Sequence, residues 1–214
     1  MLTDPFFPAT QATMIAYCGM LLSLNMHSDI PGRHMWDVPL STMTPLFSAR
    51  MTLLNALYLL AAMFIKGSIL VLYRRIFRPS FTVNVLVWIG IVVNGLLYII
   101  CFSFFMAYCT PKPEDDQFGG WISLTLHQRC NIMIKPLTYS TGIVGSVIDV
   151  YILIIPLIPI YGLSFLSGKR KLGICSIFII GSSACVFSIV GAVYRLMIQE
   201  SDPTWGSMPV YAMQ

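Results

Sequence analysis

Four long apolar runs, separated by short polar segments, dominate the chain. They cover residues 51–73, 83–108, 140–163 and 172–197. Each run exceeds about 18 residues, which is enough for a helix to cross roughly 30 Å of hydrocarbon. Backbone groups in hydrocarbon need partners within their own segment, and a barrel strand would alternate apolar with polar residues. The pattern therefore predicts an all-α fold: a polytopic transmembrane helix bundle that forms a single membrane domain over residues 1–214.

A fifth apolar run, residues 9–24, is weaker than the other four. It is only about 16 residues long and contains Thr10, Gln11 and Thr13. Such a segment is a true span, a re-entrant piece or the remnant of a longer helix. The prediction is thus four clear spans plus a weaker fifth at the N-terminal side.

Composition and charge support a membrane protein and orient it. Hydrophobic residues make up 57% of the chain and charged residues 10%, with a mean hydropathy of +0.77, which lies outside the range of soluble domains. Arg74 and Arg75 follow one apolar run and a basic stretch at residues 169–171 precedes another, so the positive-inside rule makes both cytoplasmic. The net charge of +4 is then explained by basic cytoplasmic segments that contact anionic lipid, and it does not indicate nucleic-acid binding. We expect a multi-pass protein of the plasma membrane or another endomembrane, with the lipid bilayer as its partner.

Two of the six cysteines bracket a long segment on the predicted outer side. Cys109 and Cys130 lie in a compartment that permits disulfides. A bond between them would close a loop of about 20 residues, worth on the order of 3 kcal/mol in the chain-entropy model. We favour a disulfide over two free thiols.

Two ionisable residues lie inside the predicted spans. Counted from the basic loops at about 1.5 Å per residue, Lys66 is roughly 12 Å and Asp149 roughly 21 to 30 Å from the inner boundary. The difference makes a direct salt bridge between them the less favoured pairing. Protonation would lower the insertion cost of Asp149, so we expect a neutral carboxyl unless a cation or a water-filled cavity adjoins it.

Three further polar residues fall at the counted depth of Asp149, namely Asn94, Asn55 and Ser188. Together the four would form one polar layer. Such a layer is either a site for a ligand or a proton, or a structural hub of interhelical hydrogen bonds. Both interpretations stay open.

Sequence signals for enzymatic chemistry are absent, so we expect no enzyme, no catalytic residue and no cofactor. Asp149 is the only carboxylate inside a clear span, whereas an intramembrane aspartyl protease needs two. No P-loop, GxSxG or CxxC motif occurs. The acidic and histidine residues of the segment before residue 50 match no established metal-ligand spacing, so no metal is expected.

Several motifs, in order along the chain, resemble the fungal rhodopsin-domain family of seven-helix membrane proteins. "KGSILVLYRRIF" at residues 66–77 resembles the inner end of that family's third helix, and "GRHMWDVP" at residues 32–39 its preceding outer loop. Asp149 resembles its acidic residue ahead of a proline, and Cys109 with Cys130 its outer cysteine pair. "GKRKLGICSIF" and "SIVGAVYRL" resemble the sixth helix, and "DPTW" the entry to the seventh. The positions that carry this resemblance include Lys66, Arg75, His34, Arg195 and Trp205.

The resemblance implies a receptor-like protein that senses a small extracellular ligand, with a cytoplasmic partner at the basic inner loops. Compared with the family pattern, this chain is expected to lack the first and seventh helices. Retinal binding is not expected, because the lysine that would form a Schiff base with retinal would be in the seventh helix. Two alternatives remain: a truncated family member without independent activity, or a transporter of small molecules or protons that uses Asp149.

Overall fold

A computed structural model describes most of the 214-residue chain, and the described part is mainly helical. The described residues are 6–27, 34–39, 44–76, 81–113, 120–157, 181–183 and 185–194. Four long helices are α1 (Phe6–His27), α2 (Pro45–Ile76), α3 (Phe81–Cys109) and α4 (Leu124–Ile154), with single 3-10 turns η1 (Met35–Asp37) and η4 (Gly120–Ile122). Residues 181–194 add a shorter helical segment, in which Ala184 is not described. The all-α prediction is confirmed for these residues, which contain no strand.

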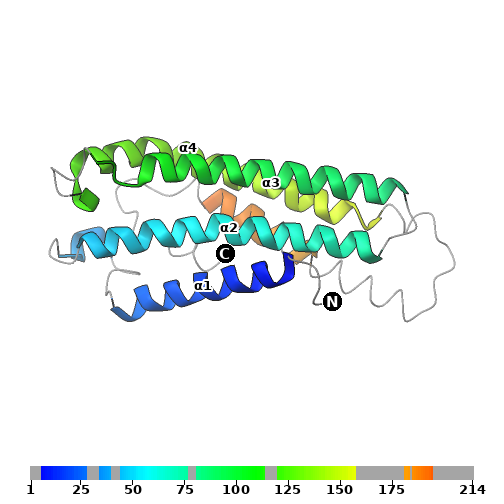
Figure 1. Ribbon diagram of the computed structural model, residues 1–214, viewed down its shortest axis with the longest axis horizontal. Helices are drawn as coiled ribbons and strands as arrows, with labels where there is room; N and C mark the ends of the chain where they lie inside the picture. The colour runs from blue at the N-terminus through cyan, green and yellow to red at the C-terminus, as the bar shows by residue number, and fades with distance from the viewer. Residues whose placement is uncertain are drawn as a thin grey trace.

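The long helices lie side by side along the longest axis of the molecule (Figure 1). Each is antiparallel to the one before it, as two contacts in each pair show. Thr10 and Tyr17 of α1 contact Phe64 and Tyr58 of α2, and Asn84 and Asn94 of α3 contact Arg74 and Met63 of α2. Leu86 and Cys109 of α3 contact Tyr151 and Cys130 of α4. Because two reversals separate them, α2 and α4 run in the same direction.

Helix α3 shows how the bundle is adapted to lipid. Its buried residues recur every three or four positions, as one face of a helix requires: Val83, Val87, Gly90, Asn94, Tyr98, Cys101, Phe105 and Cys109. The exposed positions between them are also large and apolar, among them Trp88, Val92 and Ile99. A helix that is apolar all round is typical of a membrane span.

Helices α2, α3 and α4 are each long and apolar enough to cross a membrane. They correspond to the predicted spans at 51–73, 83–108 and 140–163. The weaker run at 9–24 forms the 22-residue helix α1, which is long enough but less apolar and is not among these three. Of the predicted span at 172–197, the described part is the apolar helix Gly181–Tyr194.

Two helices begin earlier than predicted. α2 starts at Pro45, where Thr44 accepts a hydrogen bond from the Phe47 amide, and α4 starts at Leu124 rather than at residue 140. The side chain of Ser123 caps α4 by accepting from the Leu126 amide at 3.2 Å, a standard helix start. Residues 124–139, which precede the predicted span, are thus helical as well, because a helix can extend past the apolar run that marks a span.

One end of the α3–α4 pair is joined covalently, which confirms the predicted disulfide. Cys109 and Cys130 are bonded, with Cα atoms 4.7 Å apart. Beside them, Arg129 donates to the carbonyls of Tyr108 and Thr110 at 3.1 and 2.9 Å. Because these carbonyls close α3, the guanidinium also satisfies acceptors that a helix end leaves unpaired. We call this the disulfide end and the opposite end, marked by Arg74 and Arg75, the arginine end.

Candidate functional site

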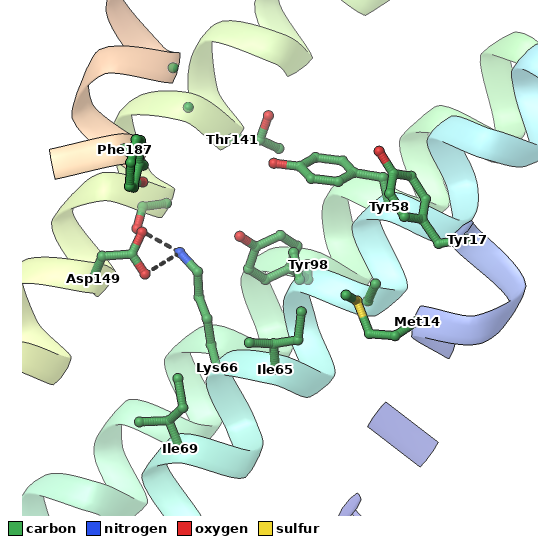
Figure 2. A pocket seen from close by; sticks show the side chains of 16 residues that line it. Met14, Tyr17, Tyr58, Ile65, Lys66, Ile69, Tyr98, Thr141, Asp149 and Phe187 are labelled. Atoms are coloured by element: carbon green, nitrogen blue, oxygen red, sulfur yellow. Dashed lines mark hydrogen bonds and ion pairs between the residues drawn. The ribbon is translucent and has the colours of Figure 1, made fainter. Parts of the chain in front are cut away.

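An ion pair lies in the interior of the bundle between α2 and α4. The Lys66 ammonium is 2.8 Å from the Asp149 carboxylate, and it also donates a 2.8 Å hydrogen bond to the Gly145 carbonyl. The side chains are 12% and 18% exposed, so both charges are largely removed from the surroundings. Figure 2 shows the two side chains pointing toward one another from different helices.

Tyr98 and Gly145 complete the immediate surroundings of the pair. The Lys66 nitrogen lies 5.9 Å from the centre of the Tyr98 ring, within the range of a cation–π interaction. The Lys66 nitrogen and the Tyr98 hydroxyl lie close to Gly145, since a Cβ added there would be 3.6 Å from each of them, an ordinary van der Waals distance. Both groups thus border the backbone of α4 at this residue.

The salt bridge corrects the expectation that a direct pairing of Lys66 with Asp149 is the less favoured one. That expectation took the basic residues at 169–171 as the membrane edge for α4. Those basic residues lie outside the described part of the chain. The 2.8 Å contact itself places the two charged groups at the same level of the bundle. The prediction of a neutral Asp149 made an exception for a neighbouring cation, and Lys66 is such a cation.

The ion pair lies on the wall of a cavity of about 330 Å³, which we call the bundle cavity. All four long helices and the segment 181–194 contribute to its lining, including Met14 and Tyr17 of α1, and Phe187 and Ser188 of the segment 181–194. Figure 2 shows the rings of Tyr17, Tyr58 and Tyr98 around the same space. The volume is at the lower end of the range of small-molecule pockets.

The four residues expected in one polar layer separate into two groups. Asp149 and Ser188 both line the bundle cavity, and the Ser188 hydroxyl lies 3.2 Å from that of Ser146. Asn94 is 1% exposed and donates to the Met63 carbonyl, and its side-chain oxygen is buried with no partner among the described residues. Asn55 donates to the Met51 carbonyl one turn earlier in its own helix. Neither asparagine lines the cavity.

Of the remaining positions that carry the family resemblance, the two described ones, Arg75 and His34, do not line the cavity. Arg75 is exposed at the arginine end. His34 stacks on Trp36 with ring centroids 4.5 Å apart in and beside η1. Arg195 and Trp205 lie outside the described residues, as do the basic residues at 169–171. Within the described part of the chain, no group of three or more potential metal ligands occurs.

Sequence reasoning missed Tyr98 and Gly145 as neighbours of the ion pair. A helical spacing would have pointed to them, because Gly145 precedes Asp149 by four residues and Tyr98 follows Asn94 by four. Residues four apart lie on the same face of a helix. The signal was therefore present once Lys66 and Asp149 were placed opposite one another.

Comparisons with known proteins agree with the helical bundle. A fungal rhodopsin domain matches residues 3–213. A SAT4 family membrane protein of Emericella nidulans is 31% identical over 147 residues, which are 65% of this chain and 35% of that protein. The chain thus spans about a third of the length of this relative. No solved structure matches. Since the domain covers nearly the whole sequence and three helices suit a membrane span, the chain is a membrane protein that belongs to the fungal rhodopsin-domain family.

Proposed function

We propose that this protein is receptor-like and senses a small extracellular molecule bound in the bundle cavity. The observation that carries the proposal is the position of the Lys66–Asp149 ion pair, which joins α2 to α4 on the wall of a cavity of about 330 Å³. A molecule in this cavity would contact both helices and the groups that hold them together. The proposal involves binding and a change of conformation, and no bond-making step.

The response would pass along α2. A ligand shifts a conformational equilibrium only by interacting differently with the two states, and the ion pair provides such a difference because it connects two helices that run in the same direction. Ten residues after Lys66, α2 ends beside the exposed Arg74 and Arg75. We propose that this end, on the predicted cytoplasmic side, contacts the intracellular partner.

Binding is tested with the purified chain in lipid nanodiscs, screened against a library of small metabolites by the shift in thermal unfolding temperature. The informative variant is Gly142→Leu, because Gly142 is buried and lines the cavity. Its matched control is Ile143→Leu, since Ile143 is 51% exposed on the neighbouring face of α4. Compounds that bind in the cavity stabilise the wild type and Ile143→Leu but not Gly142→Leu. Equal stabilisation of all three proteins would contradict the proposal.

Sensing is then separated from transport with the compounds that pass the screen. Spin labels at Leu72 and Ile154, both exposed near the arginine end, report the separation of α2 and α4 in a background without the cysteines outside the disulfide. A sensor changes this distance on binding and moves no labelled compound into proteoliposomes. Uptake into the proteoliposomes would instead favour the transporter.

A further inference from the structure

The charges that line the bundle cavity cancel one another. Of the described residues in its wall, Lys66 and Asp149 are the charged ones, and they are bonded to each other at 2.8 Å. The Lys66 ammonium also has the Gly145 carbonyl as an acceptor. The described wall is therefore neutral as a whole, with its opposite charges already satisfied.

The rest of the wall is apolar with scattered hydroxyl groups. Ile65, Ile69 and Phe187 supply apolar surface. Thr141 supplies a hydroxyl whose hydrogen is directed to its own helix, at 2.8 Å from the Leu137 carbonyl and 3.1 Å from that of Thr138. Because a hydroxyl oxygen has two lone pairs, Thr141 can still accept a hydrogen bond.

A charged guest would disturb this balance. A carboxylate would have to draw Lys66 away from Asp149, and an ammonium would have to draw Asp149 away from Lys66, so either one leaves a buried charge without its partner. Uncompensated charges are costly in the interior of a protein or a bilayer. An uncharged guest leaves the pair intact.

We infer that the bundle cavity takes uncharged amphipathic molecules with one hydrogen-bond donor and an apolar body, and rejects carboxylates and ammonium ions of the same size. The inference rests on the proposed function, since it names the class of molecule that the same cavity would sense. The preference arises because the wall has no net charge and a charged molecule can bind only by breaking the ion pair.

Three probes of nearly equal shape test this inference at neutral pH: benzyl alcohol, benzoate and benzylammonium. Binding to the chain in nanodiscs is measured by thermal shift over a concentration series, with Gly142→Leu subtracting the effect of each probe on the lipid. For the wild type we expect benzyl alcohol to bind at least about tenfold more tightly than either ion. Equal or tighter binding of an ion by the wild type overturns the inference.

Two single variants reverse the preference in opposite directions. Lys66→Ala leaves Asp149 without its ammonium partner, so benzylammonium becomes the best of the three probes. Asp149→Ala leaves Lys66 without its carboxylate, so benzoate becomes the best. If the wild type and both variants rank the three probes in the same order, Lys66 and Asp149 do not determine which probe binds best.

A double variant guards against misfolding of the single ones. Lys66→Met with Asp149→Leu removes both charges together and is expected to fold and to keep the preference for benzyl alcohol. A double variant that prefers an ion overturns the inference. Failure of the proposed function looks different, because then no probe and no library compound distinguishes the wild type from Gly142→Leu.

Discussion

Helix α3 contacts its neighbours closely, whereas α2 and α4 meet through long side chains beside a cavity. At Gly90 of α3, an added Cβ would lie 3.0 Å from the Tyr151 ring of α4 and 3.1 Å from a methyl group of Leu70 on α2. Between α2 and α4, the Lys66 ammonium contacts the Asp149 carboxylate and the Gly145 carbonyl, each at 2.8 Å. Among α2, α3 and α4, two helix pairs are thus tightly packed and the third pair is joined by an ion pair.

This difference in packing suggests different roles for α3 and for the α2–α4 contact. Close contacts through small residues resist movement, because packed interiors leave no room for displacement. A contact through one ammonium group is open to change, because the same group can be paired or unpaired. We therefore expect α3 to act as the fixed support and the α2–α4 contact as the part that responds.

The largest effect is expected from removing one charge of the pair. Lys66→Met or Asp149→Leu alone should lower the free energy of unfolding by about 3–5 kcal/mol, because each leaves a buried charge without a partner. The double variant should regain most of that loss. Unfolding of the nanodisc-embedded protein by denaturant measures all three, and additive losses in the double variant would contradict the importance of the pairing.

Removing the disulfide should have the next largest effect. Cys109→Ala with Cys130→Ala releases the disulfide end of α3 and α4 and should cost about 3 kcal/mol of stability. The charged α2–α4 contact should be retained, because the ion pair lies further along the bundle. Denaturant unfolding of the double variant beside the oxidised wild type measures the loss of stability. Loss of the preference for benzyl alcohol in the double variant would contradict the independence of the ion pair from the disulfide.

Filling the closest helix contact tests the tight side of the comparison. Gly90→Ala forces apart groups that would lie 3.0–3.2 Å from the new methyl group and should cost about 1–3 kcal/mol, the usual range for overpacking. Gly95→Ala is the matched control on the same helix, because no atom lies within 4 Å of its added Cβ. If both variants unfold at the same temperature, α3 is not tightly held at Gly90.

The smallest effect is expected from a single hydrogen bond. Tyr151→Phe removes the 2.7 Å bond from the hydroxyl to the Leu86 carbonyl and should cost about 0.6 kcal/mol, the average for such bonds between membrane helices. Tyr139→Phe changes the same group at an exposed position of α4 and should have no effect. Thermal unfolding of the two variants in parallel gives the comparison, and a loss of several degrees in Tyr139→Phe would count against it.

Apolar runs predicted the helices that cross the bundle, and most closely α3. The predicted run at 83–108 differs from Phe81–Cys109 by two residues at its start and one at its end, because short polar segments border it on both sides. The predicted start at residue 140 is 16 residues after the start of α4, because the polar residues within 124–139 interrupt the apolar pattern from which the span was predicted. The cap at Ser123 was the available signal.

The candidate site was predicted in part. Asp149 and Ser188 were identified as polar residues inside spans, and both line the cavity. The partner of Asp149 was not identified, because depth along one helix does not determine which residue of another helix lies opposite. That information depends on packing, such as the close approach of α2 and α4 to Gly90.

The bond from Lys66 to the Gly145 carbonyl joins residues 79 positions apart, and this separation has a consequence for biogenesis. Ribosomes extend a chain at about 5–20 residues per second, so α2 is made several seconds before the acceptors of its ammonium exist. During that interval the insertion machinery or the lipid headgroups must accommodate the charge. Chains that stop between α3 and α4 should therefore be retained at the translocon or degraded, and the emergence of α4 would be the step that commits α2 to the membrane.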